Sequence, residues 1–235
     1  RVASALLNRA CRFTAWPGGA LSLPAHSYMS DAPTPASAPR LYLASASPRR
    51  RELLQQIGLA HDVLRVPAPP GEDEPQLAGE SAADYVRRTA RDKAQRAVAW
   101  IRDQHLATLP ILAADTTVIL DGAVLGKPAD RADALRILQA LSGAEHEVHT
   151  AVVLAVDDQL HEALSVTRVG MRATSQAERE RYCDSGEPFG KAGAYGIQGL
   201  ASAFIAHIAG SYSGVMGLPL FETAALLARA DIQIP

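Results

Sequence analysis

The stretch LYLASASPRRRELLQQIG, residues 41–58, predicts the first strand and the first helix of the folded chain. Residues 41–44 are apolar and indicate a short strand. Ser47 is a preferred N-cap residue and Pro48 a preferred first helical residue, so a helix is expected to begin there. Gly58 is a typical residue just beyond a helix end. The sequence therefore predicts a strand that runs directly into a helix.

Three arginines, Arg49, Arg50 and Arg51, stand in the first turn of this expected helix. The helix dipole presents about half a positive charge there, and each cation costs roughly 0.3–1 kcal/mol. An anion with several oxygens would satisfy the guanidinium groups, the backbone N–H groups and the hydroxyls of Ser45 and Ser47 together. The alternative is a basic helix end exposed to solvent. These residues alone leave both interpretations open.

The composition is that of an ordinary globular protein. The 235 residues are 48% hydrophobic and 20% charged, which suffices for a substantial core. The net charge of −2 argues against a broad nucleic-acid-binding surface, so the arginine cluster favours a small anionic ligand. Cys11 and Cys183 belong to no zinc or disulfide spacing, which fits a cytosolic setting. No apolar run approaches the roughly 18 residues that a membrane helix needs.

The first forty residues differ from the remainder. Residues 1–30 contain three arginines and no acidic residue, and residues 31–40 form a linker rich in Pro, Ala and Ser. A leader of this composition is compatible with an organelle transit peptide. It lacks a clear amphipathic stripe, however, and a translation start at Met29 is the simpler account. We predict a disordered or non-native extension over residues 1–40 and one domain over residues 41–235.

Two charged features after the first helix each allow two interpretations. Glu72, Asp73 and Glu74 lie in a proline-rich loop, where acidic residues usually face solvent, although one of them could share a metal with another carboxylate. Lys93 lies on the apolar stripe of a long helix expected over residues 81–100. It either extends to solvent or presents its ammonium group to a buried anion.

Asp115 interrupts the strand-forming run ILAADTTVIL, residues 111–120. An ionised carboxylate in an apolar strand is costly unless it is paired or coordinates a metal. Asp115 is therefore the best single candidate for a catalytic or metal-binding acid, and the competing interpretation is a simple hydrogen bond to Thr116 or a nearby loop. A hairpin turn after this strand, at residues 121–122, is expected to return Lys127 to the side of Asp115.

The second half of the chain contains a glycine-rich segment, SGEPFGKAGAYGIQG, residues 185–199. Its five glycines permit close approach of the backbone to a ligand, and Lys191, Tyr195 and Gln198 supply a cation, an aromatic face and an amide for a nucleobase edge. His146 and His149 are interpreted as structural. The other expected elements are a strand at 60–66, an Asp-capped helix after residue 130, an antiparallel hairpin of strands at 145–156 and 160–171, a helix at 175–183 with a capping box of Ser175 and Glu178, a strand at 201–208, a turn at 210–214 and a helix at 218–230.

These segments together resemble the Maf family of nucleoside triphosphate pyrophosphatases. The resemblance covers residues 41–227, and the form AGAYGIQG at residues 192–199 is similar to the branch that acts on dTTP and UTP. The blocks that carry it are LASASPRRRELL at 43–54, ADTTVILDGAVLGKP at 114–128, LSGAEHEVHTAV at 141–152, EPFGKAGAYGIQG at 187–199 and GSYSGVMGLPLFET at 210–223.

The resemblance implies a fold and an activity. The expected fold is α/β, with an elongated, twisted mixed sheet flanked by helices and two lobes around a central cleft, similar to inosine triphosphate pyrophosphatases. The expected reaction is hydrolysis of dTTP and UTP to the monophosphate and pyrophosphate with Mg²⁺ or Mn²⁺, as nucleotide-pool housekeeping. The expected enzyme is a cytoplasmic homodimer that binds neither nucleic acid nor a membrane. The alternatives are a 7-methyl-GTP pyrophosphatase and a nucleotide-binding regulator of septum formation in cell division, with little turnover.

The resemblance also implies roles for particular residues. Asp115 and Lys127 are expected to be catalytic, and Asp115 and Glu74 are expected to bind the metal. Gly190 is a departure, because many members of the family carry an acidic residue at this position. The residues expected to bind the substrate are Ser45, Arg49, Arg50, Lys93, Lys191 and Gln198, the last of these against the base.

Overall fold

The structure is a computed structural model that describes residues 40–67, 75–157 and 159–234. These residues belong to one unit, which spans residues 36–235. Of the predicted extension over residues 1–40, only residue 40 is described. Glu74 of the acidic loop lies outside the described residues.

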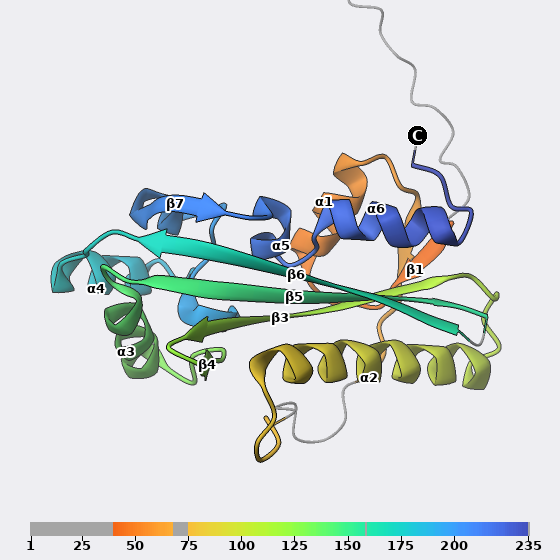
Figure 1. Cartoon of the computed structure of the whole chain (residues 1–235), viewed down its shortest axis with the longest axis horizontal. Helices are drawn as coiled ribbons and strands as arrows, with labels where there is room; N and C mark the ends of the chain where they lie inside the picture. The colour runs from red at the N-terminus through yellow and green to blue at the C-terminus, as the bar shows by residue number, and fades with distance from the viewer. Residues whose placement is uncertain (1–39, 68–74, 158, 235) are drawn as a thin grey trace, which may run out of the picture. The chain divides into compact units, whose positions relative to one another are not determined.

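A seven-stranded sheet runs through the described residues (Figure 1). The strand order is β2-β1-β3-β5-β6-β7, and β4 pairs with β3. β1 pairs in parallel with β2 and β3, whereas the other pairs are antiparallel, so the predicted α/β fold with a mixed sheet is confirmed. The strands are β1 Leu41–Leu43, β2 His61–Val63, β3 Ile111–Leu120, β4 Ala123–Leu125, β5 Glu145–Val156, β6 Gln159–Met171 and β7 Ile205–Ala209.

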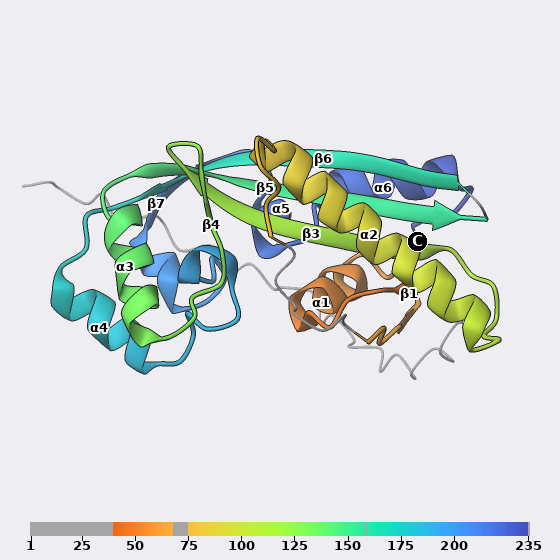
Figure 2. The ribbon, with the colours of Figure 1, turned by 90° about the horizontal axis from the view of Figure 1, so that it is seen from below.

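Helices cover both faces of the sheet. The α-helices are α1 Pro48–Gln56, α2 Ala82–Asp103, α3 Arg131–Leu141, α4 Gln176–Asp184, α5 Tyr212–Met216 and α6 Leu220–Arg229, and two short 3₁₀ helices are η1 Ala192–Ala194 and η2 Leu200–Phe204. α2 crosses one face of the long strands and α6 lies against the other, while α3 and α4 gather at one end (Figures 1 and 2). No helix among the described residues is both long and apolar enough to cross a membrane.

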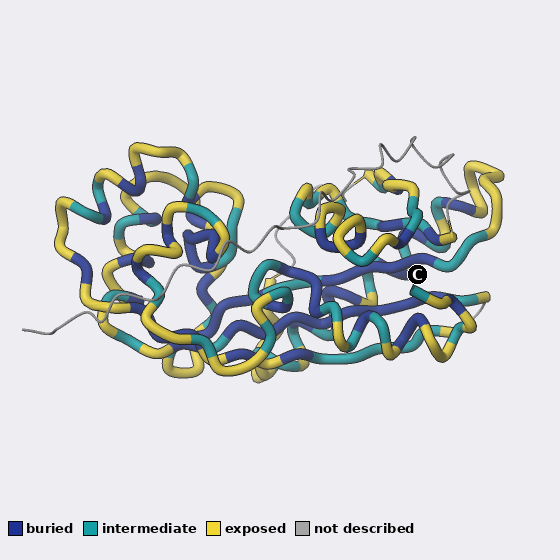
Figure 3. The backbone as a smooth tube through the Cα atoms, turned by 90° about the horizontal axis from the view of Figure 1, so that it is seen from above, coloured by how far each residue is buried: buried dark blue, intermediate teal, exposed yellow. Residues whose placement is uncertain are grey.

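Four clusters of buried side chains lie along the sheet among the described residues, and β3 contributes to all of them, including the two largest. Ala114 belongs to a cluster with Leu54 of α1 and Leu227 of α6. Val118 belongs to a second cluster, with Leu138 of α3 as a further member. Each fully buried leucine contributes roughly 1.5–3 kcal/mol of burial free energy, so each cluster holds its own set of helices against the strands. The central strands are buried along most of their length (Figure 3).

One edge of β3 is open between these two clusters. On its other edge β3 pairs with β5 from Ile111 to Ile119. On the open edge, β1 pairs only with residues 111–112 and β4 only with residues 118–120. Among the described strands, none therefore covers residues 113–117 on this side, and backbone groups there need other partners.

Local capping explains where several helices begin. The side chain of Asp130 accepts a bond from the Asp133 N–H at the start of α3, and Ser175 forms a full capping box with Glu178 at the start of α4. The predicted hairpin turn at residues 121–122 joins β3 to β4. The hairpin of β5 and β6 is also confirmed.

Three predicted elements differ from the observed ones. The strand predicted at 201–208 begins only at Ile205, because residues 200–204 form η2. The turn predicted at 210–214 leads into α5, whose first turn is capped by the Ser211 hydroxyl. The strand predicted at 60–66 is shortened to His61–Val63.

Candidate active site

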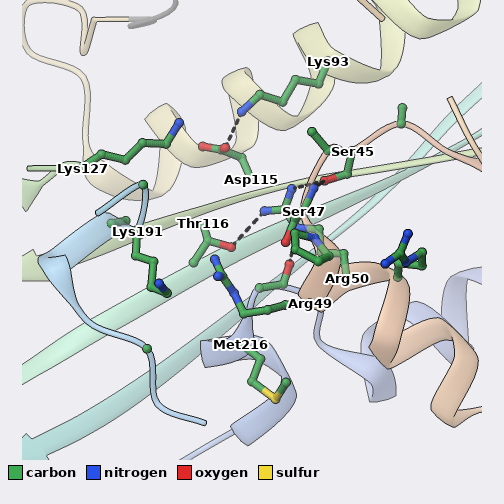
Figure 4. Close-up of a pocket in the computed structure, with 18 of the residues that line it drawn as sticks. Ser45, Ser47, Arg49, Arg50, Lys93, Asp115, Thr116, Lys127, Lys191 and Met216 are labelled. Atoms are coloured by element: carbon green, nitrogen blue, oxygen red, sulfur yellow. Dashed lines mark hydrogen bonds and ion pairs between the residues drawn. The ribbon is translucent and has the colours of Figure 1, made fainter. Parts of the chain in front are cut away.

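A cavity of about 780 Å³ opens beside the uncovered edge of β3. It is within the range of ligand pockets, which is about 300–1,000 Å³. Its walls come from the start of α1, the middle of β3, one face of α2, the loop before and after η1, and the end of α5. The topology thus leaves a gap in the sheet, and segments far apart in the sequence line that gap (Figure 4).

Arg50 connects three of these walls. Its Nε donates to the Gly217 carbonyl at 2.7 Å, and its Nη1 donates to the Ala114 carbonyl at 2.8 Å and to Ser45 Oγ at 3.1 Å. Its Nη2 donates to Thr116 Oγ1 at 3.3 Å. Burial lowers the pKa of the Arg50 guanidinium, and the charge of Asp115 acts in the opposite direction. Arg50 therefore replaces the missing strand at the open edge of β3.

The start of α1 presents unsatisfied donors to the cavity. Ser47 is the N-cap residue, but its side chain makes no capping hydrogen bond. Ser45 Oγ instead accepts from the Ser47 N–H at 3.2 Å, which shapes the turn before the helix. The first-turn N–H groups have no partners within the helix, and such a helix start binds anions readily.

Arg49 and Lys191 face one another across the cavity (Figure 4). The pKa of the Lys191 ammonium is lowered, first by burial and then by the charge of Arg49. Lys191 Nζ donates to the Glu187 backbone carbonyl, which fixes its direction. Two neighbouring cations repel each other, and an anion between them would remove this repulsion.

Asp115 is held from α2. Its Oδ1 contacts the Lys93 ammonium, and its Oδ2 accepts from Thr89 Oγ1 at 2.7 Å. Lys127 points toward the same carboxylate from the opposite side (Figure 4). Lys93 therefore directs its ammonium group to an acid, and Asp115 bonds to residues of α2 and not to Thr116, whose hydroxyl accepts from Arg50.

The charge of the cavity wall is strongly positive. Among the described residues, one carboxylate, that of Asp115, lines it. The basic residues that line it are Arg49, Arg50, Arg51, Arg65, Lys93, Arg96, Lys127 and Lys191. In a partly buried site such an excess of cations is compensated most simply by a polyanion.

A divalent metal fits this donor set through phosphate oxygens rather than through a protein cage. The described residues contain no group of three or more His, Cys, Asp and Glu side chains that could hold a metal. Mg²⁺ usually binds one or two carboxylates together with substrate phosphates and water, and the partly exposed carboxylate of Asp115 can serve as one of these ligands. The second predicted ligand, Glu74, lies outside the described residues.

The glycine-rich loop forms the remaining wall. Gln198 is exposed and lines the cavity, and the buried Tyr195 also lines it. Gly193 has φ +70°, and a Cβ there would lie 2.8 Å from the Val118 side chain, so the loop packs directly on β3. Gly190 also lines the cavity, but a Cβ there would meet no atom within 4 Å. Gly190, where the resemblance implies an acidic residue in many family members, therefore borders open space.

The structure brings eight of the nine predicted site residues to one cavity; they are Ser45, Arg49, Arg50, Lys93, Asp115, Lys127, Lys191 and Gln198. Two further residues, Thr89 and Thr116, are in contact with this set and were not predicted. Thr116 follows Asp115 directly on β3. Thr89 precedes Lys93 by four residues on α2, so Thr89 and Lys93 lie on one face of that helix. That spacing is the signal that would have identified Thr89.

Comparison with known proteins shows the family to which the chain belongs. A protein from Bordetella parapertussis named dTTP/UTP pyrophosphatase is 74% identical over 207 residues, which cover 88% of this chain and 100% of the relative. Proteins of the same name from Bordetella avium and Ralstonia nicotianae are 75% identical over 197 residues and 54% identical over 205 residues, covering 84% and 86% of this chain and 98% and 99% of the relatives. The family described as Maf-like protein matches residues 40–230, and the chain therefore belongs to the Maf family.

Proposed function

We propose that this chain hydrolyses nucleoside triphosphates, with dTTP and UTP as substrates, to the monophosphate and pyrophosphate, as nucleotide-pool housekeeping. The observation that carries the proposal is that Asp115 supplies the one carboxylate among the described residues of a cavity wall that also carries eight basic side chains. The names of the relatives from Bordetella and Ralstonia support the choice of substrates.

The cations match the charge of the substrate. A nucleoside triphosphate carries close to four negative charges, and Arg49, Lys127 and Lys191 line the cavity together with the first-turn N–H groups of α1. Arg50 adds charge, although four of its five N–H donors already bond to the protein. We assign the triphosphate to the space between Arg49 and Lys191, where like charges otherwise repel.

Asp115 is the proposed general base. Thr89 and Lys93 hold its carboxylate in one orientation, so it accepts a proton from a water molecule directed at the α-phosphorus. The water oxygen bonds to phosphorus, and the bond from the α-phosphorus to the bridging oxygen breaks. Pyrophosphate leaves with that oxygen, and Lys127 and Arg49 stabilise the charge that develops on it.

A divalent cation, Mg²⁺ or Mn²⁺, is part of the proposal. Asp115 would hold it together with phosphate oxygens, and Glu74 is the second predicted ligand. When bound, the metal supplies Lewis-acid stabilisation of phosphoryl charge. Removal of divalent metal with EDTA should abolish pyrophosphate release, and addition of Mg²⁺ or Mn²⁺ should restore it; full activity in EDTA would contradict this part.

A nucleotide panel tests the proposal. Pyrophosphate release should be fastest with dTTP and UTP, and slow with 7-methyl-GTP, which is the substrate of the alternative branch. A protein that binds these nucleotides but releases no pyrophosphate would be the second alternative, a regulator of septum formation. Asp115→Asn should bind dTTP and remain folded while releasing no pyrophosphate, whereas normal turnover by this variant would refute the role of Asp115.

Arg49→Ala separates binding from catalysis. Because a hydrogen bond to a charged group is worth about 1.5–3 kcal/mol, the KM for dTTP should rise by roughly ten- to a hundredfold. Asp62→Ala is a matched control on an exposed residue of β2 that does not line the cavity. An unchanged KM in Arg49→Ala would count against the phosphate site.

The remaining parts of the proposal concern the state of the protein. We propose a homodimer in the cytoplasm that acts on free nucleotides and binds neither nucleic acid nor membranes. Light scattering at micromolar concentration should give about 50 kDa, twice the mass of the 24.9 kDa chain. A mass of one chain at that concentration would exclude the dimer.

A further inference from the structure

We propose that Glu187 is a positioning residue that sets nucleobase selectivity, because its carboxylate holds the loop that presents Gln198 to the cavity. This inference rests on the proposed function, in which Gln198 contacts the base. Glu187 itself does not line the cavity, and it follows α4 by three residues. Its effect on the substrate is therefore indirect.

The Glu187 carboxylate bonds to the backbone just after Gln198. Oε2 accepts from the Leu200 N–H at 2.8 Å, and Oε1 accepts from the Ala201 N–H at 3.4 Å. These two N–H groups lie at the start of η2, so the carboxylate also neutralises the positive end of that turn. The same two bonds explain why residues 200–204 do not continue β7 as a strand.

The Tyr182 hydroxyl links the Glu187 carboxylate to the backbone before Gln198 by hydrogen bonds. Tyr182 Oη donates to Glu187 Oε1 at 2.8 Å and accepts from the Gly196 N–H at 3.2 Å. Tyr182 is buried, and burial followed by the bond to Glu187 raises the pKa of its phenol, so it stays protonated and can donate. One carboxylate and one phenol thus fix the chain on both sides of Gln198.

The loop is packed closely around the carboxylate. A Cβ at Gly199 would lie 2.3 Å from Glu187 Oε2, a distance that no real contact allows. Residue 199 is next to Gln198 in the chain, so a side chain there would displace either Glu187 or the loop. Glycine at residue 199 leaves room for the Glu187 carboxylate, and the carboxylate bonds to the backbone of the same loop.

Glu187 also directs a cation. Its backbone carbonyl accepts from Lys191 Nζ, and the Lys191 side chain lines the cavity opposite Arg49. The residue therefore joins the part of the wall assigned to phosphate with the part assigned to the base. Because the bond to Lys191 uses the backbone carbonyl, it remains when the Glu187 side chain is replaced, so such a substitution is expected to act on the base contact.

The test measures selectivity rather than activity alone. UTP and CTP have the same sugar and phosphates and differ only at the base, so the ratio of their kcat/KM values reports the base contact. In Glu187→Ala this ratio should fall by about tenfold, equivalent to about 1.4 kcal/mol. In Glu187→Gln the ratio should fall less, because the amide oxygen can still accept at least one of the three hydrogen bonds that the carboxylate accepts. A purely structural role would lower both values equally and leave the ratio unchanged.

Four further variants complete the design. Gln198→Ala should lower the ratio by itself, and Glu187→Gln added to Gln198→Ala should lower it no further, because both act through one contact. Tyr182→Phe should shift the ratio in the same direction as Glu187→Gln, and it provides a test if the Glu187 variants do not fold. Asp184→Asn, at the exposed end of the same helix, removes an ion pair with Arg131 and should leave the ratio unchanged.

The outcomes separate this inference from the proposed function. If the wild type prefers UTP but Glu187→Ala and Tyr182→Phe keep the full preference, the inference is wrong and the proposed function stands. The inference is also wrong if Gln198→Ala keeps the preference, or if Glu187→Gln lowers the ratio additively in the Gln198→Ala background. If the wild type releases pyrophosphate from no nucleotide, the proposed function itself fails.

Discussion

The protonation of one buried histidine should make folding stability depend on pH. His146 of β5 is 2% exposed, and its Nε2 lies 2.8 Å from Tyr195 Oη, with the two rings edge to face. Its Nδ1 is buried and has no hydrogen-bond partner among the described residues. Burial lowers the pKa of the imidazole from 6.5 to about 4, with a small opposing effect of Glu145, so His146 is neutral in the folded protein.

The sign and size follow from proton linkage. Between pH 6.5 and pH 4 the unfolded chain binds a proton at His146 that the folded chain does not, so the free energy of unfolding falls as pH falls through this window. With these two pKa values, the loss between pH 8 and pH 5 is about 2 kcal/mol. Below pH 4 both states are protonated, and the effect of this residue no longer grows.

Urea unfolding of the wild type and His146→Gln at pH 8 and pH 5 measures this effect. Glutamine reaches as far as Nε2 and can still bond to the Tyr195 hydroxyl, but it does not titrate. Each protein serves as its own reference at pH 8, and the urea m value should stay constant. The wild type should lose about 2 kcal/mol more than the variant on going to pH 5. Equal losses in the two proteins would refute the assignment of a buried, neutral imidazole.

Three further substitutions test the site and its supports. Gly193→Ala should destabilise the fold by about 1–3 kcal/mol more than Gly190→Ala in urea unfolding. Both glycines have φ near +70°, but only at Gly193 would a Cβ lie against β3. Equal losses of stability in the two variants would contradict the packing of this loop. Thr89→Val should lower kcat for UTP by about tenfold, since it removes one bond to Asp115, and an unchanged kcat would contradict that support. Arg50→Lys keeps the charge but loses the forked donors, so urea unfolding should show a loss of at least about 2 kcal/mol; full stability would mean that charge alone matters there.

The elements that the sequence predicted well are those specified by neighbouring residues. The helix after Ser47 and Pro48, the hairpin of β3 and β4, and the capping box at Ser175 each depend on contacts within a few residues. Elements that depend on distant partners were predicted less well. A strand was expected from residue 201, but the N–H groups of Leu200 and Ala201 bond to the distant Glu187 carboxylate, and residues 200–204 form a 3₁₀ helix.

The same distinction applies to the site. Asp115 could be identified because a charge inside an apolar strand is anomalous in the sequence itself. The role of Thr116 as the acceptor for Arg50 could not, because it depends on the gap between β1 and β4 on one edge of β3. The similarity to inosine triphosphate pyrophosphatases and the roles of the predicted site residues remain predictions.

The bond from Arg50 to Gly217 also bears on the order in which the protein becomes functional during synthesis. It joins residues 167 positions apart, so the ribosome must release most of the polypeptide before the arginine meets its carbonyl. Contacts of such long sequence separation form late, because chain entropy opposes them. The nascent chain thus exposes its arginine-rich helix well before it has a place to hold a nucleotide, and a product truncated ahead of Gly217 would carry Asp115 and the cations but lack the carbonyl that anchors Arg50.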